Sequence, residues 1–121
     1  MKSFEALGLS KGLVESVALL GFEVPTPIQE KAIPVLLQGD RDFVGLAQTG
    51  TGKTAAFGLP MLDLMDDKSR DTQALVLAPT RELCLQITNE LENFSEKVKR
   101  LNIVAVYGGS SIMDQMRSIK K

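Results

Sequence analysis

The sequence contains no histidine and no tryptophan, and Cys84 is the only cysteine among its 121 residues. Without histidine, zinc-finger ligation by Cys and His and acid–base catalysis by an imidazole are both excluded in this chain. A single cysteine permits no internal disulfide, which favours a reducing compartment. We expect Cys84 to pack as a small hydrophobic residue rather than to react as a thiol.

The sequence also lacks an apolar run near the roughly 20 residues that a membrane-spanning helix requires. Its first residues, Met-Lys-Ser-Phe, are not followed by the hydrophobic stretch of a secretory signal. We therefore expect a cytoplasmic protein without a membrane partner. The net charge of −1 gives no overall basic surface for nucleic acid, so any such contact must be local. The more basic last quarter can be simply a solvated face.

The length and a composition of 44% hydrophobic and 24% charged residues suit one small globular domain. Three apolar runs, at 42–47, 74–78 and 103–107, predict strands buried on both faces, as in a parallel sheet. They alternate with helical patterns, one after Lys53 and one between the second and third runs. This order predicts an α/β fold with an open parallel sheet and helices on both faces.

Two further helices are expected before the first strand, at 12–20 and 27–37. Ser10 suits the N-cap of the first, Thr26 followed by Pro27 suits the start of the second, and Pro34 should kink it. The helix after the second strand presents an apolar stripe with helical spacing, which predicts a core-facing side: Leu83, Ile87, Leu91, Phe94 and Val98. Residues 110–121 predict a polar helix, and we expect the chain to stop inside an α/β unit.

A glycine-rich segment between the first predicted strand and the next helix carries the main chemical signature. Gly50-Thr51-Gly52-Lys53-Thr54 lets consecutive backbone N–H groups converge on phosphate oxygens at a positive helix N-terminus. Lys53 would reach the β- and γ-phosphates, and the Thr54 hydroxyl would be a Mg²⁺ ligand. The alternative is a glycine-rich turn that binds nothing.

Ala47 occupies the first position of the phosphate-loop pattern G-x-x-x-x-G-K-[ST], where glycine is usual. An alanine there requires only that residue 47 avoid positive φ. Alanine at this position therefore restricts the type of phosphate loop that can form, but it leaves the loop able to bind phosphate.

Two residues upstream of the loop could contact a nucleotide base. The Gln29 amide can pair with adenine at two points, and the ring of Phe4, seventeen positions before Gly21, can stack on a base. Gln29 could instead be a surface helix residue, and Phe4 could be an ordinary core residue. The two residues alone favour these simpler interpretations.

Four segments in this order, "GFEVPTPIQ", "AQTGTGKT", "PTRELCLQ" and "YGG", resemble the Q motif, motif I, motif Ia and GG motif of the DEAD-box RNA helicases. The resemblance runs from Phe4 to Gly109. It implies a P-loop NTPase of RecA-like fold, and its Q motif separates DEAD-box proteins from neighbouring helicase groups. The expected division is 1–40 as a helical Q-motif region and 41–121 as a partial RecA-like domain 1, ending before the acidic Walker B motif.

The resemblance implies a role for each matching residue. ATP with its Mg²⁺ would be bound by Phe4, Thr26, Gln29, Gln48, Thr49, Gly50, Thr51, Gly52, Lys53 and Thr54. Lys53 and Thr54 would also serve catalysis, and Thr54 would contact the metal. RNA-backbone contacts would come from Pro79, Thr80, Arg81, Gly108 and Gly109. Thr80 also suits a simple helix N-cap, and Arg81 could pair with Glu82 instead of RNA.

The sequence contains no Asp-Glu-Ala-Asp, so we expect the chain alone to bind nucleotide weakly and neither to hydrolyse it usefully nor to unwind RNA. The alternative function is a non-catalytic clamp that binds RNA when adenine nucleotide is bound. A P-loop kinase or GTPase would leave Gln29 and 80–82 without a role. In a RecA-like fold, the strand that pairs with 42–47 comes from later in the sequence. The edge of 42–47 would then be unpaired in this chain, so we also expect self-association through this open sheet edge.

Overall fold

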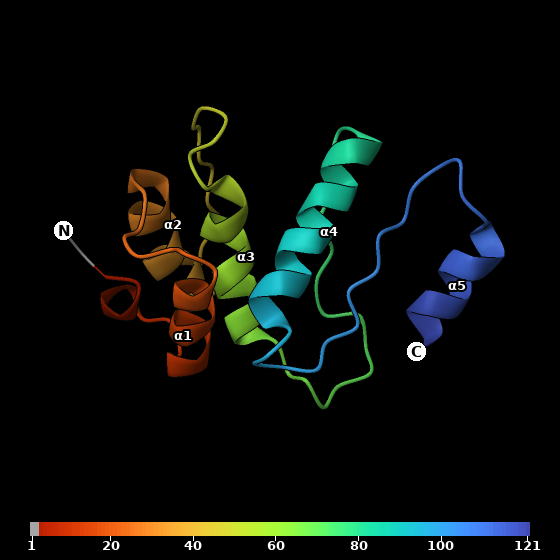
Figure 1. Cartoon of the computed structure of the whole chain (residues 1–121), viewed down its shortest axis with the longest axis horizontal. Helices are drawn as coiled ribbons and strands as arrows, with labels where there is room; N and C mark the ends of the chain where they lie inside the picture. Colours follow the sequence, from red (N-terminus) through yellow and green to blue (C-terminus); the bar gives the residue numbers. More distant parts are fainter. Residues whose placement is uncertain (1–2) are drawn as a thin grey trace.

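The computed structural model describes residues 3–121, and within this range its regular structure is entirely helical. The elements are η1 (Glu5–Leu7), α1 (Lys11–Leu19), α2 (Pro27–Gln38), α3 (Lys53–Leu64), α4 (Arg81–Ser95) and α5 (Ile112–Lys120). Helices α1 to α4 pack together, whereas α5 stands apart at the opposite end of the molecule (Figure 1). None of these helices has both the length and the apolar character of a membrane span.

The predicted helix starts are confirmed. Ser10 and Thr26 are the N-cap residues of α1 and α2, and Pro27 occupies the first turn of α2. Pro at this position costs no hydrogen bond because the first N–H groups of a helix have no partner within the helix. Helix α2 continues past the internal Pro34 to Gln38.

One hydrophobic core joins the N-terminal region to the helices that follow, so 1–40 and 41–121 do not form separate cores within the described residues. Ile87, Leu91 and Phe94 of the predicted stripe are buried, and Leu83 and Val98 pack half-buried against the core. Helices α3 and α4 approach closely at Gly58, where an added Cβ would lie 2.7 Å from a Leu91 methyl. The fully and nearly buried core members are Phe4, Leu7, Leu9, Leu13, Val17, Ile33, Ala55, Leu59, Leu62, Ile87, Leu91 and Phe94.

Polar contacts tie the ends of these helices together. The Lys99 Nζ donates to the carbonyls of Leu62, Asp63 and Met65, at 2.9, 2.9 and 2.8 Å. A cation at this place adds a donor to the last carbonyls of α3 and offsets the negative end of the helix. Lys99 thereby fixes the C-terminal end of the helix that begins at the phosphate loop.

The expected parallel sheet is not formed: none of the residues 3–121 lies in a strand. Segments 42–47, 74–78 and 103–107 make no backbone hydrogen bonds to one another in this range. An open groove is lined by Thr49, Gly50, Gly52, Lys53 and Thr54 and by Leu75, Val76 and Leu77. Ladder pairing requires neighbouring strands about 4.8 Å apart, and no ladder joins these segments within residues 3–121.

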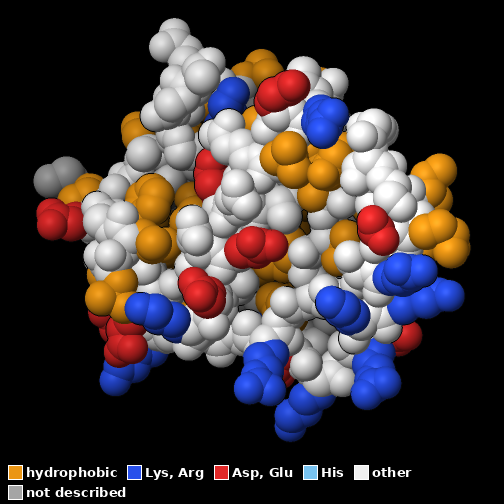
Figure 2. Space-filling model, turned by 45° about the vertical axis from the view of Figure 1, so that its right-hand side comes forward, with side chains coloured by type: hydrophobic (Ala, Val, Ile, Leu, Met, Phe, Trp, Pro, Cys, Tyr) orange, Lys and Arg blue, Asp and Glu red, His pale blue; other side chains and the backbone are white. Residues whose placement is uncertain are grey.

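The predicted burial of these segments on both faces is wrong, because only one face packs. Val76, Ala78 and Ile103 lie against the core, as the alternation of an extended chain allows. The opposite face is open, with Leu46 at 94% and Leu77 at 85% exposed. Hydrophobic side chains are also visible on the surface in Figure 2, while Lys and Arg gather mainly along its lower margin.

Helix α5 was predicted at 110–121 and runs from Ile112 to Lys120, with the Ser111 hydroxyl accepting from the Asp114 N–H. The polar description is incomplete, because apolar side chains follow one side of the helix and stay exposed: Ile112, Met113, Met116 and Ile119. Side-chain amides connect α5 to the extended chain before it. Asn102 donates to the Ser118 carbonyl at 2.7 Å.

Candidate nucleotide and RNA site

The phosphate-loop segment adopts the turn that its glycines permit. Gly50 and Gly52 both have φ of 81°, and the Thr51 hydroxyl donates to the Gln48 carbonyl at 2.6 Å. Backbone conformations of this kind are open mainly to glycine. No non-glycine residue of the described chain has positive φ, so the condition predicted for Ala47 is met.

Lys53 and Thr54 stand at the positive end of α3, directly after the loop. Gly52 is the N-cap, Lys53 is exposed and Thr54 is half-buried. Both side chains line the groove of about 910 Å³ together with Thr49, Gly50 and Gly52. Five of the residues predicted to hold nucleotide therefore share one open groove, whereas Gln48 and Thr51 do not line it. The dipole of α3 favours an anion at this helix start.

Gln29 connects the Q-motif segment to the loop. Its Oε1 accepts from the Thr26 N–H at 3.0 Å, and its Nε2 donates to the Gly52 carbonyl at 3.1 Å. The side chain is only 1% exposed, so the surface interpretation is wrong. The amide contact to the phosphate loop was missed by sequence reasoning, which considered the base as its only partner.

Thr26 presents an unused polar group beside the same junction. Its Oγ1 is buried, has no hydrogen-bond partner within residues 3–121, and lies 3.4 Å from the position of a Cβ on Gly52. In the capping box of α2 this hydroxyl faces the Gln29 backbone N–H, a group on α2 rather than on the loop. The predicted coupling of Thr26 to the phosphate loop stays a prediction.

Phe4 lies in the hydrophobic core and is 3% exposed, which agrees with the simpler interpretation as a core residue. In this conformation its ring is covered by other side chains. The predicted stacking on a base requires a face of the ring to open, and it stays a prediction.

The predicted RNA-contact residues form a second cluster at the start of α4. The Thr80 hydroxyl accepts from the Leu83 N–H at 3.1 Å, which confirms the N-cap. The Arg81 guanidinium lies 4.8 Å from the centre of the Tyr107 ring, and a Cβ on Gly109 would lie 3.1 Å from its Nη1. Motif Ia and the GG motif therefore meet at Arg81.

The alternative ion pair between Arg81 and Glu82 is not formed. Within residues 3–121 the recorded salt bridge joins Arg117 to Asp114 at 3.7 Å, on the surface of α5. Pro79, Gly108 and Gly109 are exposed beside the Arg81 cluster. Sequence reasoning did not identify Tyr107, although its place directly before the two glycines could have suggested it.

The described residues contain no group of three or more acidic, cysteine or histidine side chains able to hold a metal by themselves. A single hydroxyl ligand, Thr54, next to a phosphate-binding turn fits a Mg²⁺ ion that is carried by nucleotide phosphates rather than by a protein cage. The donor set thus fits the predicted cofactor, while Mg²⁺ itself stays a prediction.

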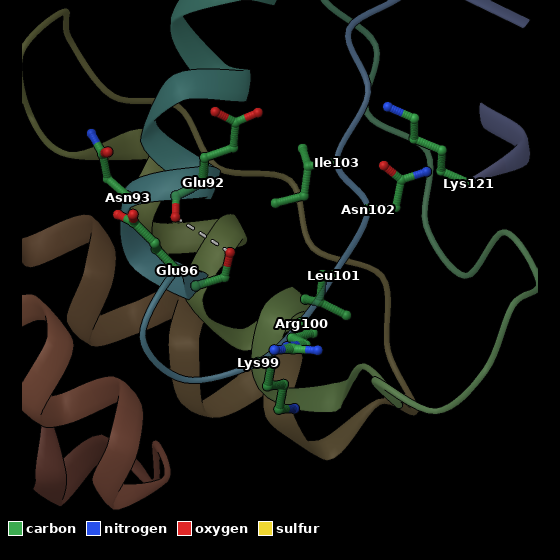
Figure 3. Close-up of a pocket in the computed structure, with 10 residues that line it drawn as sticks. Glu92, Asn93, Glu96, Lys99, Arg100, Leu101, Asn102, Ile103 and Lys121 are labelled. Carbon is green, nitrogen blue, oxygen red and sulfur yellow. Dashed lines mark hydrogen bonds between the residues drawn. The ribbon is translucent and has the colours of Figure 1, made fainter. Parts of the chain in front are cut away.

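A second hollow of about 720 Å³ lies at the other end of α4 and has no part in this site (Figure 3). Glu92 of α4 and Glu96, the residue after its end, line it on one side, with the 99–103 segment and Lys121 around the rest. None of the predicted nucleotide or RNA residues lines this hollow, and its charges are of mixed sign.

The Gln29 amide thus joins the start of α2 to the glycine-rich loop, and Arg81, Tyr107 and Gly109 form a separate cluster at the start of α4. The chain belongs to the DEAD/DEAH box helicase family, whose model matches residues 26–121. Over its full length it is 54% identical to the ATP-dependent RNA helicase CshA of Listeria monocytogenes, of which it spans 23%.

Solved structures agree with this assignment. A DEAD box protein from the hyperthermophile Methanococcus jannaschii superposes with a TM-score of 0.91 at 38% identity, over 98% of this chain and 32% of that chain. The RNA-helicase Prp28 from Chaetomium thermophilum bound to ADP gives 0.87 at 41% identity, over 99% and 30%. The arrangement of helices is therefore that of helicase domains of this family.

The contact between Gln29 and Gly52 generates a matched pair of substitutions. Gly50→Ala and Gly52→Ala both place alanine at φ of 81°, but only the Cβ at Gly52 collides with the Gln29 amide. We expect Gly52→Ala to lower the free energy of unfolding by about 1 kcal/mol more than Gly50→Ala, measured by urea denaturation. In a Gln29→Ala background the two glycine substitutions should lower the free energy of unfolding equally. If their difference stays unchanged in that background, the clash with the Gln29 amide is not its cause.

Proposed function

We propose that this chain supplies the ATP-binding and part of the RNA-binding surface of an ATP-dependent RNA helicase that separates short RNA duplexes. The observation that carries this proposal is the direct bond between the Gln29 amide and the Gly52 carbonyl. It connects a group able to read adenine with the loop able to hold phosphate. The similarity to proteins named RNA helicases supports the substrate class.

In this proposal Gln29 forms hydrogen bonds with adenine, Phe4 stacks on the base, and Thr26 couples the adenine-binding segment to the phosphate loop. Phosphates lie against the 48–54 segment, with Lys53 at the β- and γ-phosphates and Thr54 at a Mg²⁺ ion that neutralises phosphate charge. Region 1–40 thus supplies the base contacts and region 41–121 the phosphate and RNA contacts. The cytoplasmic location stays a prediction from the sequence.

RNA is proposed to lie along the start of α4, where Pro79, Thr80 and Arg81 meet Gly108 and Gly109. Backbone N–H groups at a helix start and an exposed guanidinium suit phosphate oxygens. Contacts of this kind hold RNA without reading its sequence. A local cluster of this size agrees with a chain whose net charge is −1.

The adenine assignment is tested by comparing ATP with GTP. We expect wild-type protein to bind ATP more tightly than GTP, and Gln29→Ala to lower ATP affinity about tenfold while changing GTP affinity much less, because two hydrogen bonds to adenine are lost. Isothermal titration calorimetry measures both. Because the loss of the Gly52 contact affects both nucleotides alike, the ATP-to-GTP ratio isolates base recognition; equal losses for both would refute the assignment.

Hydrolysis by the chain alone is a separate question. Since the sequence contains no Asp-Glu-Ala-Asp to hold magnesium and orient water, we expect no phosphate release above background when single-stranded RNA is added. A malachite-green assay measures this, with Lys53→Ala as the control for contaminating ATPases. RNA-stimulated release that disappears in Lys53→Ala would show a complete catalytic site and overturn the expectation.

The alternative proposal is a non-catalytic clamp, which shares every residue of the site described above. In a clamp the output is RNA binding that depends on adenine nucleotide, without strand separation. An acidic motif in a longer chain would distinguish the two, because magnesium-dependent hydrolysis requires it.

We further propose that segments 42–47, 74–78 and 103–107 become strands of the open parallel sheet when neighbouring strands fill the groove between them. When those neighbouring strands are absent, the unpaired backbone of the three segments and their exposed apolar side chains bind a second copy of this chain. Val44, Leu46, Leu75 and Leu77 are each at least 80% exposed, which supports association through this face.

Self-association through this face predicts a concentration-dependent rise in mass by light scattering after size exclusion. Leu77→Lys should shift the protein toward monomer, because a charge on the open face opposes edge pairing. Leu19→Lys, at a site that is 73% exposed on α1, is the matched control and should leave the mass unchanged. A wild-type protein that stays monomeric at high concentration contradicts the proposal.

A further inference from the structure

Tyr107 lies at the centre of the Arg81 cluster and has no role in the site as predicted from sequence. Its half-buried ring lies 4.8 Å below the guanidinium of the exposed Arg81. Stacking on an aromatic face leaves the edge of the guanidinium, with its N–H groups, free for other partners. The Gly109 backbone closes the space on the Nη1 side, since an added Cβ there would lie 3.1 Å from that atom.

The backbone of Tyr107 is itself held from α5. The Gln115 Nε2 donates to the Tyr107 carbonyl at 2.9 Å, and the Tyr107 N–H donates to the Gln115 Oε1 at 3.2 Å. On the other side the Cys84 thiol, one turn along α4 from Arg81, lies 3.9 Å from the Val106 carbonyl. The backbone that carries the ring is therefore held by side chains of two helices, and the ring itself contacts Arg81.

We propose that Tyr107 is a positioning residue that holds the Arg81 guanidinium ready for an RNA phosphate; the role rests on the proposed RNA binding by Arg81. A long arginine side chain loses rotamer freedom when it binds, and a side chain that is already held loses less. No carboxylate within residues 3–121 pairs with Arg81, so its in-plane N–H groups have no competing anion. Gln115 acts indirectly, because it holds the backbone of the segment that carries the ring.

The test uses the 121-residue chain with fluorescein-labelled oligouridylate as the RNA probe, and it compares Tyr107→Leu with Tyr107→Phe. We expect Tyr107→Leu to weaken binding about two- to fivefold and Tyr107→Phe to remain near wild type, because phenylalanine keeps the aromatic face. In an Arg81→Ala background Tyr107→Leu should have no further effect. Circular dichroism of each variant checks folding.

A second readout needs no RNA. The side-chain Nε–H resonance of Arg81, identified by its loss in Arg81→Ala, should carry a ring-current shift in wild type and Tyr107→Phe and lose it in Tyr107→Leu. Equal RNA affinities of the Leu and Phe variants, or a Tyr107→Leu effect that persists without Arg81, would overturn the role of Tyr107.

The outcomes separate this inference from the proposed function. If Arg81→Ala leaves RNA affinity unchanged, the RNA role of Arg81 fails, and with it the function proposed for Tyr107, whatever the ring-current shift shows. If Arg81→Ala weakens binding but Tyr107→Leu does not, RNA binding by Arg81 stands and the positioning role alone is refuted.

Discussion

The contact on which this structure most depends is the pair of hydrogen bonds made by the buried Gln29 amide. One bond fixes the start of α2 through the Thr26 N–H, and the other holds the phosphate loop through the Gly52 carbonyl. A buried amide that lost either partner would pay a desolvation cost of about 1–3 kcal/mol. The start of α2 and the glycine-rich loop are therefore joined through one buried side chain.

Much of the helical frame could be predicted, because caps and apolar spacing are local features. Thr26 with Pro27 marked the start of α2, and the stripe through Ile87, Leu91 and Phe94 identified the buried side of α4. The sheet could not be predicted in the same way. An apolar run such as 74–78 specifies an extended segment that suits burial, but pairing depends on a neighbour that the run itself does not encode.

In the candidate site, too, the local features could be predicted from the sequence and the long-range contacts could not. Residue types at fixed spacing predicted the glycine turn at 50–52, since the φ values of Gly50 and Gly52 follow from the local turn. The partners of Gln29 and Arg81 could not be read from spacing, because Gly52 and Tyr107 are each more than twenty positions away. Side-chain contacts across such separations depend on how the helices pack, and the sequence pattern gives no direct measure of that.

Glutamine side-chain amides bond the backbone at three places outside the helices. Gln115 bonds both backbone groups of Tyr107, and Gln73 in the same way bonds the N–H and the carbonyl of Asp66, each at 2.8 Å. Gln29 completes the set at the phosphate loop. A primary amide offers a donor and an acceptor in the spacing of a peptide group, so it can satisfy extended backbone without a strand.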